Sequence, residues 1–167
     1  MNNLTVQLEK EALRIEEDSE HSAKGHYNTA DRWKRYHLAI GLPAAILAAI
    51  ASGTAFNNMP ETAGVLAILA TALTTVLTFL KPSEHAENHK AIAGQYLALR
   101  NQTRLFREIE LIEVGYNDET KNRLIELAKH RDDLNLSSPS PNRKDYELAR
   151  SDIEAGFSQY KADKEGK

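Results

Sequence analysis

The main pattern in the sequence is a pair of uncharged apolar stretches within otherwise charged, helical sequence. No Asp, Glu, Lys or Arg occurs between Arg35 and Glu61, or between Glu61 and Lys81. The two stretches, residues 38–56 and 62–80, are each 19 residues long. At about 1.5 Å per residue, a helix of that length spans roughly 28 Å, close to the hydrocarbon thickness of a bilayer. The pattern therefore predicts two membrane-spanning helices.

A short turn joins the two stretches. Its sequence, Asn57-Asn58-Met59-Pro60-Glu61, is rich in residues that favour turns, so we expect a transmembrane hairpin over residues 37–81. The alternative is a soluble protein that buries the hairpin in a larger bundle or oligomer. We disfavour it because helices that are apolar on every face need partners all round. The first stretch also begins too late in the chain to be a signal peptide.

The residues that flank the hairpin predict its orientation. Three basic residues precede the first stretch and one follows the second, whereas the loop carries a single acidic residue, Glu61. The positive-inside rule then places both termini in the cytoplasm and the loop on the outer side of the membrane. Two aromatic residues lie where interfacial side chains are expected. The predicted interface anchors are Arg32, Trp33, Lys34, Arg35, Tyr36 and Lys81.

The polar sequence on either side of the hairpin predicts cytoplasmic helices. Residues 1–36 have the apolar spacing of an amphipathic helix, with an interruption at Gly25. Residues 82–167 predict a cytoplasmic helical region with helices at about 83–114, 119–135 and 142–161. Ser83 has the sequence context of an N-cap. No strand pattern competes, so the fold class is all-α: a two-helix transmembrane hairpin with a cytoplasmic helical bundle.

The predicted helix over residues 83–114 has a wide apolar stripe. Its central positions follow a spacing of three and four residues: Ile92, Tyr96, Leu99, Thr103 and Phe106. Further apolar positions widen the stripe: Ala91, Ala98, Leu105, Ile109 and Ile112. We expect such faces to pack together within the bundle or against other subunits.

Composition and motifs argue against catalysis. The 167 residues include no cysteine, which excludes a disulfide framework, thiolate zinc and a cysteine nucleophile. The formal charge of −3 argues against a basic nucleic-acid binder. Neither a phosphate-binding glycine loop nor a nucleophile elbow occurs. His85 and His89 share a helix face but have no identifiable third ligand. We therefore predict no enzyme, no cofactor, no metal site and no nucleic-acid partner.

Each apolar stretch also has a pattern of its own. In the first, Gly41, Ala45, Ala49 and Gly53 recur every four residues, which gives a flat face for close helix packing. In the second, four threonines lie on one side of the helix: Thr71, Thr74, Thr75 and Thr78. Each hydroxyl could bond the carbonyl four residues earlier, or the four could line a water-filled pore. A single hairpin cannot enclose a pore, so the second interpretation requires a homo-oligomer.

Several local sequences resemble those of a known family. They are Asp31-Arg32-Trp33-Lys34 before the hairpin, Phe79-Leu80-Lys81-Pro82-Ser83-Glu84-His85-Ala86 after it, Tyr96-Leu97-Ala98-Leu99-Arg100, and Asp145-Tyr146-Glu147-Leu148-Ala149-Arg150. With the two-helix hairpin, they resemble the SLATT family of SMODS- and SLOG-associating two-transmembrane effectors. The resemblance brings no catalytic residues.

The resemblance implies a function. It suggests a pore-forming effector of a bacterial anti-phage conflict system, which disrupts the inner membrane after oligomerisation or nucleotide-linked activation. A separate protein that generates or senses a nucleotide would be its partner. The alternative is a membrane-anchored helical interaction module that recruits a partner without conducting.

Overall fold

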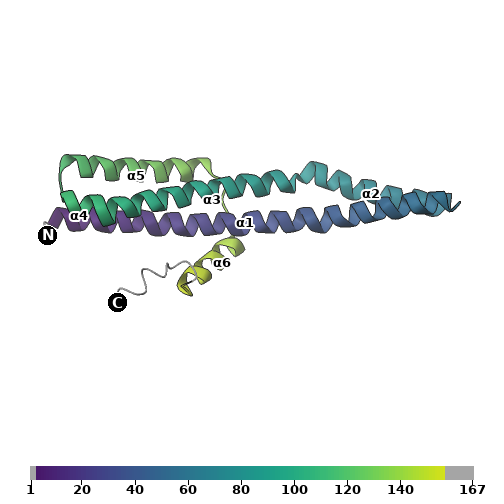
Figure 1. Cartoon of the computed structure of the whole chain (residues 1–167), viewed down its shortest axis with the longest axis horizontal. Coiled ribbons are helices and arrows are strands. Elements are labelled where there is room, and N and C mark those ends of the chain that lie inside the picture. The colour runs from purple at the N-terminus through teal and green to yellow at the C-terminus, as the bar shows by residue number, and fades with distance from the viewer. Residues whose placement is uncertain (1–2, 157–167) are drawn as a thin grey trace. The chain divides into compact units, whose positions relative to one another are not determined.

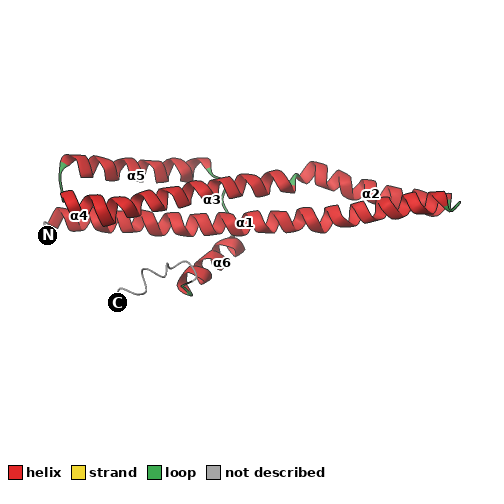
Figure 2. Ribbon diagram, viewed as in Figure 1, coloured by secondary structure: helices red, strands yellow, loops and turns green. Residues whose placement is uncertain are grey.

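A computed structural model of the protein describes residues 3–156, and within that range every regular element is a helix (Figures 1 and 2). The elements are α1 (Asn3–Phe56), α2 (Pro60–Leu80), α3 (Pro82–Leu105), the π-helical segment η1 (Phe106–Glu110), α4 (Leu111–Val114), α5 (Asp118–Ser137) and α6 (Arg143–Glu154). The chain divides into two compact units. We call residues 30–88 the hairpin unit and the described part of the remainder the bundle. The predicted all-α fold with a two-helix hairpin is confirmed.

The expected break at Gly25 is wrong, because α1 is one continuous helix of 54 residues. Gly25 is buried, and a Cβ placed on it would lie 3.5 Å from Pro141 Cγ. A Cβ at that distance would make an ordinary van der Waals contact, so this packing does not require glycine. A glycine in a helix costs about 1 kcal/mol relative to alanine, which does not interrupt a helix of this length.

The ends of the other helices follow local chemistry. Lys81 ends α2 in the left-handed conformation, with φ of 43°, and its N–H donates to the Leu77 carbonyl oxygen. Because α3 already begins at Pro82, Ser83 lies in its first turn, and its expected role as N-cap is wrong. α4 ends at Val114, before Gly115, as predicted.

The last two helices begin with asparagine caps. Asn117 accepts from the Thr120 N–H in a capping box that starts α5. Asn142 accepts from the Asp145 N–H at the start of α6. α6 then ends at Glu154, and positions 157–161 of the predicted helix lie outside the described residues.

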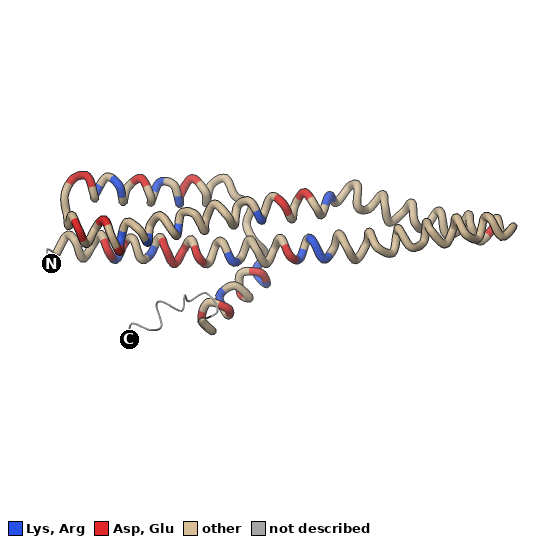
Figure 3. Tube along the Cα trace, in the orientation of Figure 1, with Lys and Arg blue, Asp and Glu red and all other residues tan. Residues whose placement is uncertain are grey.

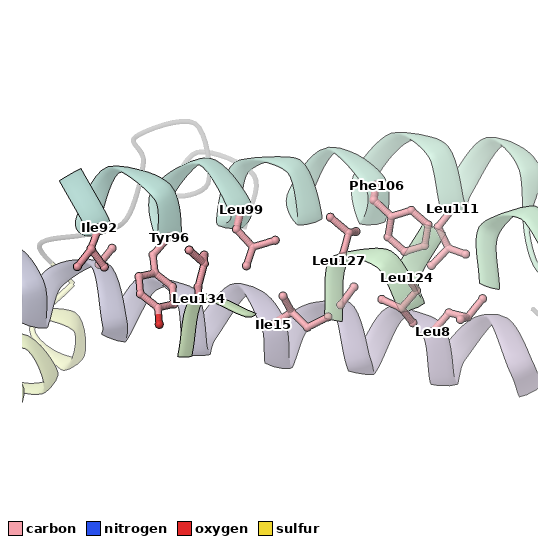
Figure 4. Close-up of a cluster of buried hydrophobic side chains, with 12 residues drawn as sticks. Leu8, Ile15, Ile92, Tyr96, Leu99, Phe106, Leu111, Leu124, Leu127 and Leu134 are labelled. Carbon is pink, nitrogen blue, oxygen red and sulfur yellow. The ribbon is translucent and has the colours of Figure 1, made fainter. Parts of the chain in front are cut away.

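The core of the bundle forms where α1, α3 to α4, and α5 meet (Figure 4). The predicted central stripe of α3 is buried in this core, from Ile92 to Phe106. The next buried position, Leu111, is five residues further on, because η1 inserts one residue into the helical repeat. The π-helical segment therefore keeps Leu111 on the inner face.

The positions expected to widen this stripe are not buried. Ala91, Ala98, Leu105, Ile109 and Ile112 are all exposed. Packing of these positions within the bundle is not observed, because α1 and α5 cover only the inner face of α3, and their packing against other subunits stays a prediction. A second, outer apolar face is left on the same helix.

Hydrogen bonds to Asp145 hold α6 against α1. Asp145 is only 6% exposed, and Thr29 Oγ1 donates to its Oδ2 over 2.8 Å. Asn28 Nδ2 donates to the Asp145 carbonyl oxygen over 3.1 Å. The burial of an acidic group is tolerated here because it accepts hydrogen bonds.

Truncation of the core should destabilise the bundle far more than truncation of the surface. Leu99 is fully buried, so Leu99→Ala should lower the free energy of unfolding by about 2–5 kcal/mol. Leu136 is 87% exposed, and Leu136→Ala should change it by less than about 0.5 kcal/mol. Urea titration of the detergent-solubilised protein, followed by circular dichroism, measures both. Equal effects of the two substitutions would contradict the core assignment.

Candidate functional site

The hairpin leaves its apolar surface uncovered. Within the described residues, two helices are long and apolar enough to cross a membrane, judged by length and composition. The most apolar 18-residue windows of these helices are only 11% and 6% buried. Figure 3 shows that Lys, Arg, Asp and Glu are absent from both arms of the hairpin apart from its turn. The chain alone therefore does not bury the hairpin, and its cover must be lipid or other chains.

The two arms of the hairpin contact each other along a narrow line of small residues. Ala44 and Ala51 of α1 and Ala70 of α2 are 5–7% exposed. A Cβ placed on Gly41 would lie 3.3 Å from Leu77 Cδ1, so a larger side chain there would push against α2. Small residues allow this close approach of the two backbones.

The predicted packing face on α1 lies mostly outside this contact. Of its four residues only Gly41 meets α2, while Ala45, Ala49 and Gly53 are exposed. A Cβ on Gly53 would meet nothing within 4 Å. Helix packing through this face stays a prediction, and it would have to involve another chain.

An open groove of about 780 Å³ runs between the two arms of the hairpin. We call it the hairpin groove. Of its 13 lining residues, eight are alanine, glycine or serine, four are threonine, and the last is Phe79. The large aliphatic side chains Ile46, Ile50, Leu69 and Val76 are 42–49% exposed, and none of them lines the groove. The hairpin thus has a side of small and hydroxylated residues, and its bulky aliphatic residues lie elsewhere.

All four predicted threonines line the hairpin groove. Each hydroxyl donates to the carbonyl oxygen four residues earlier, over 2.8–3.0 Å, from Thr71 to Ala67, Thr74 to Ala70, Thr75 to Thr71 and Thr78 to Thr74. The expected bonds from each hydroxyl to its own helix backbone are therefore observed. These bonds are compatible with a pore lining, because a donating hydroxyl oxygen still has lone pairs that accept hydrogen bonds from water.

Aromatic and basic side chains gather at the polar end of the hairpin unit. The Trp33 ring stacks on His85 with a centroid distance of 4.7 Å. The Arg32 Cζ atom lies 5.7 Å from the centroid of Trp33 and 5.8 Å from that of Tyr36. Such side chains have an apolar body and a polar end, which suits the boundary between lipid and water.

The other predicted anchors are exposed basic residues. Lys34 and Arg35 are exposed, and Lys81 Nζ lies 3.1 Å from a carboxylate oxygen of Glu84. An ion pair this exposed contributes little to stability. The role of these cations as interface anchors stays a prediction.

Sequence spacing did not reveal the actual partner of His89. Its Nδ1 lies 2.9 Å from Nδ1 of His26, and both rings are buried in the bundle. One ring must therefore carry its proton on Nδ1 and donate it to the other. The Tyr96 ring stacks on His26 at 5.7 Å. No group of three His, Asp or Glu side chains in the described part of the chain could hold a metal ion.

Burial, and then the charge of His89, lower the pKa of His26 from 6.5 to about 4. The unfolded chain therefore binds a proton at His26 between pH 6.5 and 4 that the folded chain does not. Stability contributed by neutral His26 is complete above this window and falls as the pH decreases through it. The slope approaches about 1.4 kcal/mol per pH unit for one proton.

Replacement of His26 should reduce this pH dependence. We expect His26→Asn to flatten the fall in unfolding free energy between pH 7 and 5, measured by urea titration at each pH. His130→Asn is the matched control, because His130 is exposed on α5. If the unfolding free energy of His26→Asn falls between pH 7 and 5 as steeply as that of the unaltered protein, His26 is not the source of the pH dependence.

Comparison with known proteins connects the hairpin with a family. The model of the SMODS and SLOG-associating 2TM effector domain family 4 matches residues 17–165. This range includes both apolar arms, the groove between them and most of the bundle. No curated protein and no solved structure matches the chain.

Proposed function

Because the chain belongs to the family of SMODS- and SLOG-associating two-transmembrane effector domains, we propose that it is a pore-forming effector of a bacterial anti-phage conflict system. Copies of the protein assemble in the inner membrane, with both termini in the cytoplasm, and open a water-filled path. The hairpin groove carries this proposal, because it gathers hydroxyl groups in a hairpin that its own chain leaves uncovered. The family is not a known enzyme family, and the proposed action is permeation rather than catalysis.

The chemistry of the hairpin surface indicates which side faces water. Lipid tails solvate the exposed aliphatic residues Ile46, Ile50, Leu69 and Val76 well. Lipid offers no hydrogen bonds to the acceptor lone pairs of the groove threonines, whereas a hydrated lumen does. A ring of hairpins with the groove facing inward satisfies both requirements.

A pore of this kind needs contacts between neighbouring hairpins. Apolar side chains gain little by leaving lipid, so close packing and hydrogen bonding drive association there. The exposed small residues Ala45, Ala49 and Gly53 allow a second helix to approach the backbone of α1. A separate protein that generates or senses a nucleotide would supply the signal for assembly or opening.

A second candidate function is a membrane anchor for an interaction module. It is favoured by the outer apolar face of α3, which could recruit a partner without any conduction. In that case the hairpin groove would hold lipid tails or a neighbouring helix, and its hydroxyls would have no role in permeation.

Removal of the hydroxyls tests the pore. The variant Thr71→Leu/Thr75→Leu/Thr78→Leu should assemble as before but release a trapped dye from liposomes only at background level, because the path loses its hydrogen-bonding groups. The matched control, Val65→Leu/Leu69→Ile/Val76→Leu, changes three residues that do not line the groove and should retain release. Full dye release by the threonine variant would contradict a path lined by these hydroxyls, whereas assembled protein that releases no dye in any form would favour the anchor.

The orientation has its own test, since the chain contains no cysteine that would add background labelling. A membrane-impermeant maleimide should label Asn58→Cys in the hairpin turn on intact spheroplasts. Asn122→Cys on α5 should react only after lysis, because the bundle is cytoplasmic in this proposal. The reverse pattern of labelling would contradict the orientation.

A further inference from the structure

A pocket of about 620 Å³ lies within the bundle, beside the end of α4. Its lining comes from three segments of the bundle: Thr5 and Glu9 of α1, Arg107, Leu111 and Ile112 of η1 and α4, and Tyr116 of the turn that follows α4. We call it the bundle pocket. Its volume lies in the range of sites that hold small molecules.

Two unusual backbone segments border the bundle pocket. The π-helical segment η1 contains Arg107 and precedes Leu111, and such insertions are frequent at functional sites. Gly115 also lines the pocket, with φ of 73° and ψ of −159°, a conformation that essentially only glycine adopts. A Cβ on Gly115 would meet nothing within 4 Å, so this conformation, and not the space, requires glycine. The turn at Gly115 brings Tyr116 into the lining.

The positive charge of Arg107 is already neutralised within the chain. Its Nε lies 2.6 Å from a carboxylate oxygen of Glu16, and its Nη2 lies 2.8 Å from one of Glu108. The side chains of Arg107 and Glu16 are only 19% and 11% exposed, so this pair is weakly screened by solvent. Because two carboxylates offset one guanidinium, Arg107 gives the pocket no net attraction for an anion.

Glu9 adds a further carboxylate to the bundle pocket. Within the described residues, no hydrogen bond or ion pair involves the Glu9 side chain. The chain segment that forms the other wall is acidic as well, because residues 108–120 contain five Asp or Glu residues and no Lys or Arg (Figure 3). Lys10 is exposed and does not line the pocket. The pocket therefore has a negative potential, which favours a cation.

The remaining lining suits an apolar group. Leu111 and Ile112 supply aliphatic surface, and Tyr116, which also packs against the hydrophobic core, supplies an aromatic ring. The face of such a ring attracts a cation. Ile112 is 77% exposed, so a bound molecule would cover apolar surface that the chain itself leaves in water.

We propose that the bundle pocket binds a small organic cation: a protonated amine on an aromatic or aliphatic body. The ammonium group donates to the Glu9 carboxylate, and the body contacts Leu111, Ile112 and Tyr116. A hydrogen bond between two charged groups is about twice as strong as one between neutral groups. A phosphate-bearing ligand does not fit, because the acidic lining repels it. The proposal concerns the bundle alone and does not rest on conduction by the hairpin.

Three probes of similar size and different charge test this preference. They are 2-phenylethylamine, 2-phenylethanol and 3-phenylpropanoate, each titrated by calorimetry into the full-length protein in a non-ionic detergent, with protein-free micelles as the blank. We expect the amine to bind with a Kd of about 1 mM, as suits a fragment of this size. The alcohol and the carboxylate should bind at least about tenfold more weakly.

A pair of variants tests the contact with Glu9. Glu9→Gln should raise the Kd of the amine at least about tenfold, because it removes the charge that the ammonium group faces. Glu113→Gln is the matched control, since Glu113 is exposed in the acidic segment but does not line the pocket. It should leave the Kd within about twofold. Circular dichroism shows whether both variants remain folded.

Each other outcome overturns the proposal. Equal affinity for the amine and the alcohol would mean that the pocket is only an apolar recess, and tightest binding of the carboxylate would mean that Arg107 sets the preference. An equal effect of the two variants would contradict the contact with Glu9. No saturable binding of the amine by the unaltered protein overturns the bundle pocket even when the protein releases dye, whereas binding without dye release contradicts only the pore.

Discussion

An apolar helix surface that its own chain does not cover must be covered by something else, and the rest of the structure depends on this constraint. Both apolar windows of the hairpin are almost bare. Inside lipid, backbone polar groups must be satisfied within the segment, which a continuous helix achieves. α1 runs unbroken from the bundle to Phe56, and within its apolar arm Pro43 alone has no N–H to donate, which leaves the Ala39 carbonyl oxygen without that bond. Charged residues are confined to the ends of the hairpin, where Trp33 and Arg32 form an aromatic and basic cluster.

The two units carry exposed apolar surfaces of different composition, and the difference matches their surroundings. In the hairpin, the exposed surface suited to protein contact consists of alanine and glycine, because lipid removes the hydrophobic driving force and close approach matters most. In the bundle, the exposed apolar side chains include Leu105, Ile109 and Ile112, whose burial is favourable in water.

Sequence alone predicts the features that depend on local pattern. The turn-forming residues after Phe56 indicate the end of the first arm, the charge at Lys81 indicates the end of the second at Leu80, and Gly115 indicates the end of α4. Periodicity could not show which apolar positions of α3 and its continuation are covered by the chain itself, and Leu105 and Ile112 are exposed. Gly25 suggests a helix break, but α1 continues through it because the packed helix on either side outweighs the low helix propensity of one glycine. The hydrogen bond between His26 and His89 joins residues 63 positions apart, so no local sequence pattern could predict it.

The central claim is that the threonine side of the hairpin faces water while its aliphatic side faces lipid. Spin labels on single cysteines test it most directly in the assembled protein in liposomes. Oxygen, which concentrates in lipid, should relax labels at Leu69 and Val76, and a water-soluble nickel complex should reach labels at Thr71, Thr75 and Thr78. Threonine positions that respond to oxygen as strongly as the aliphatic ones, and that the nickel complex does not reach, would contradict the account.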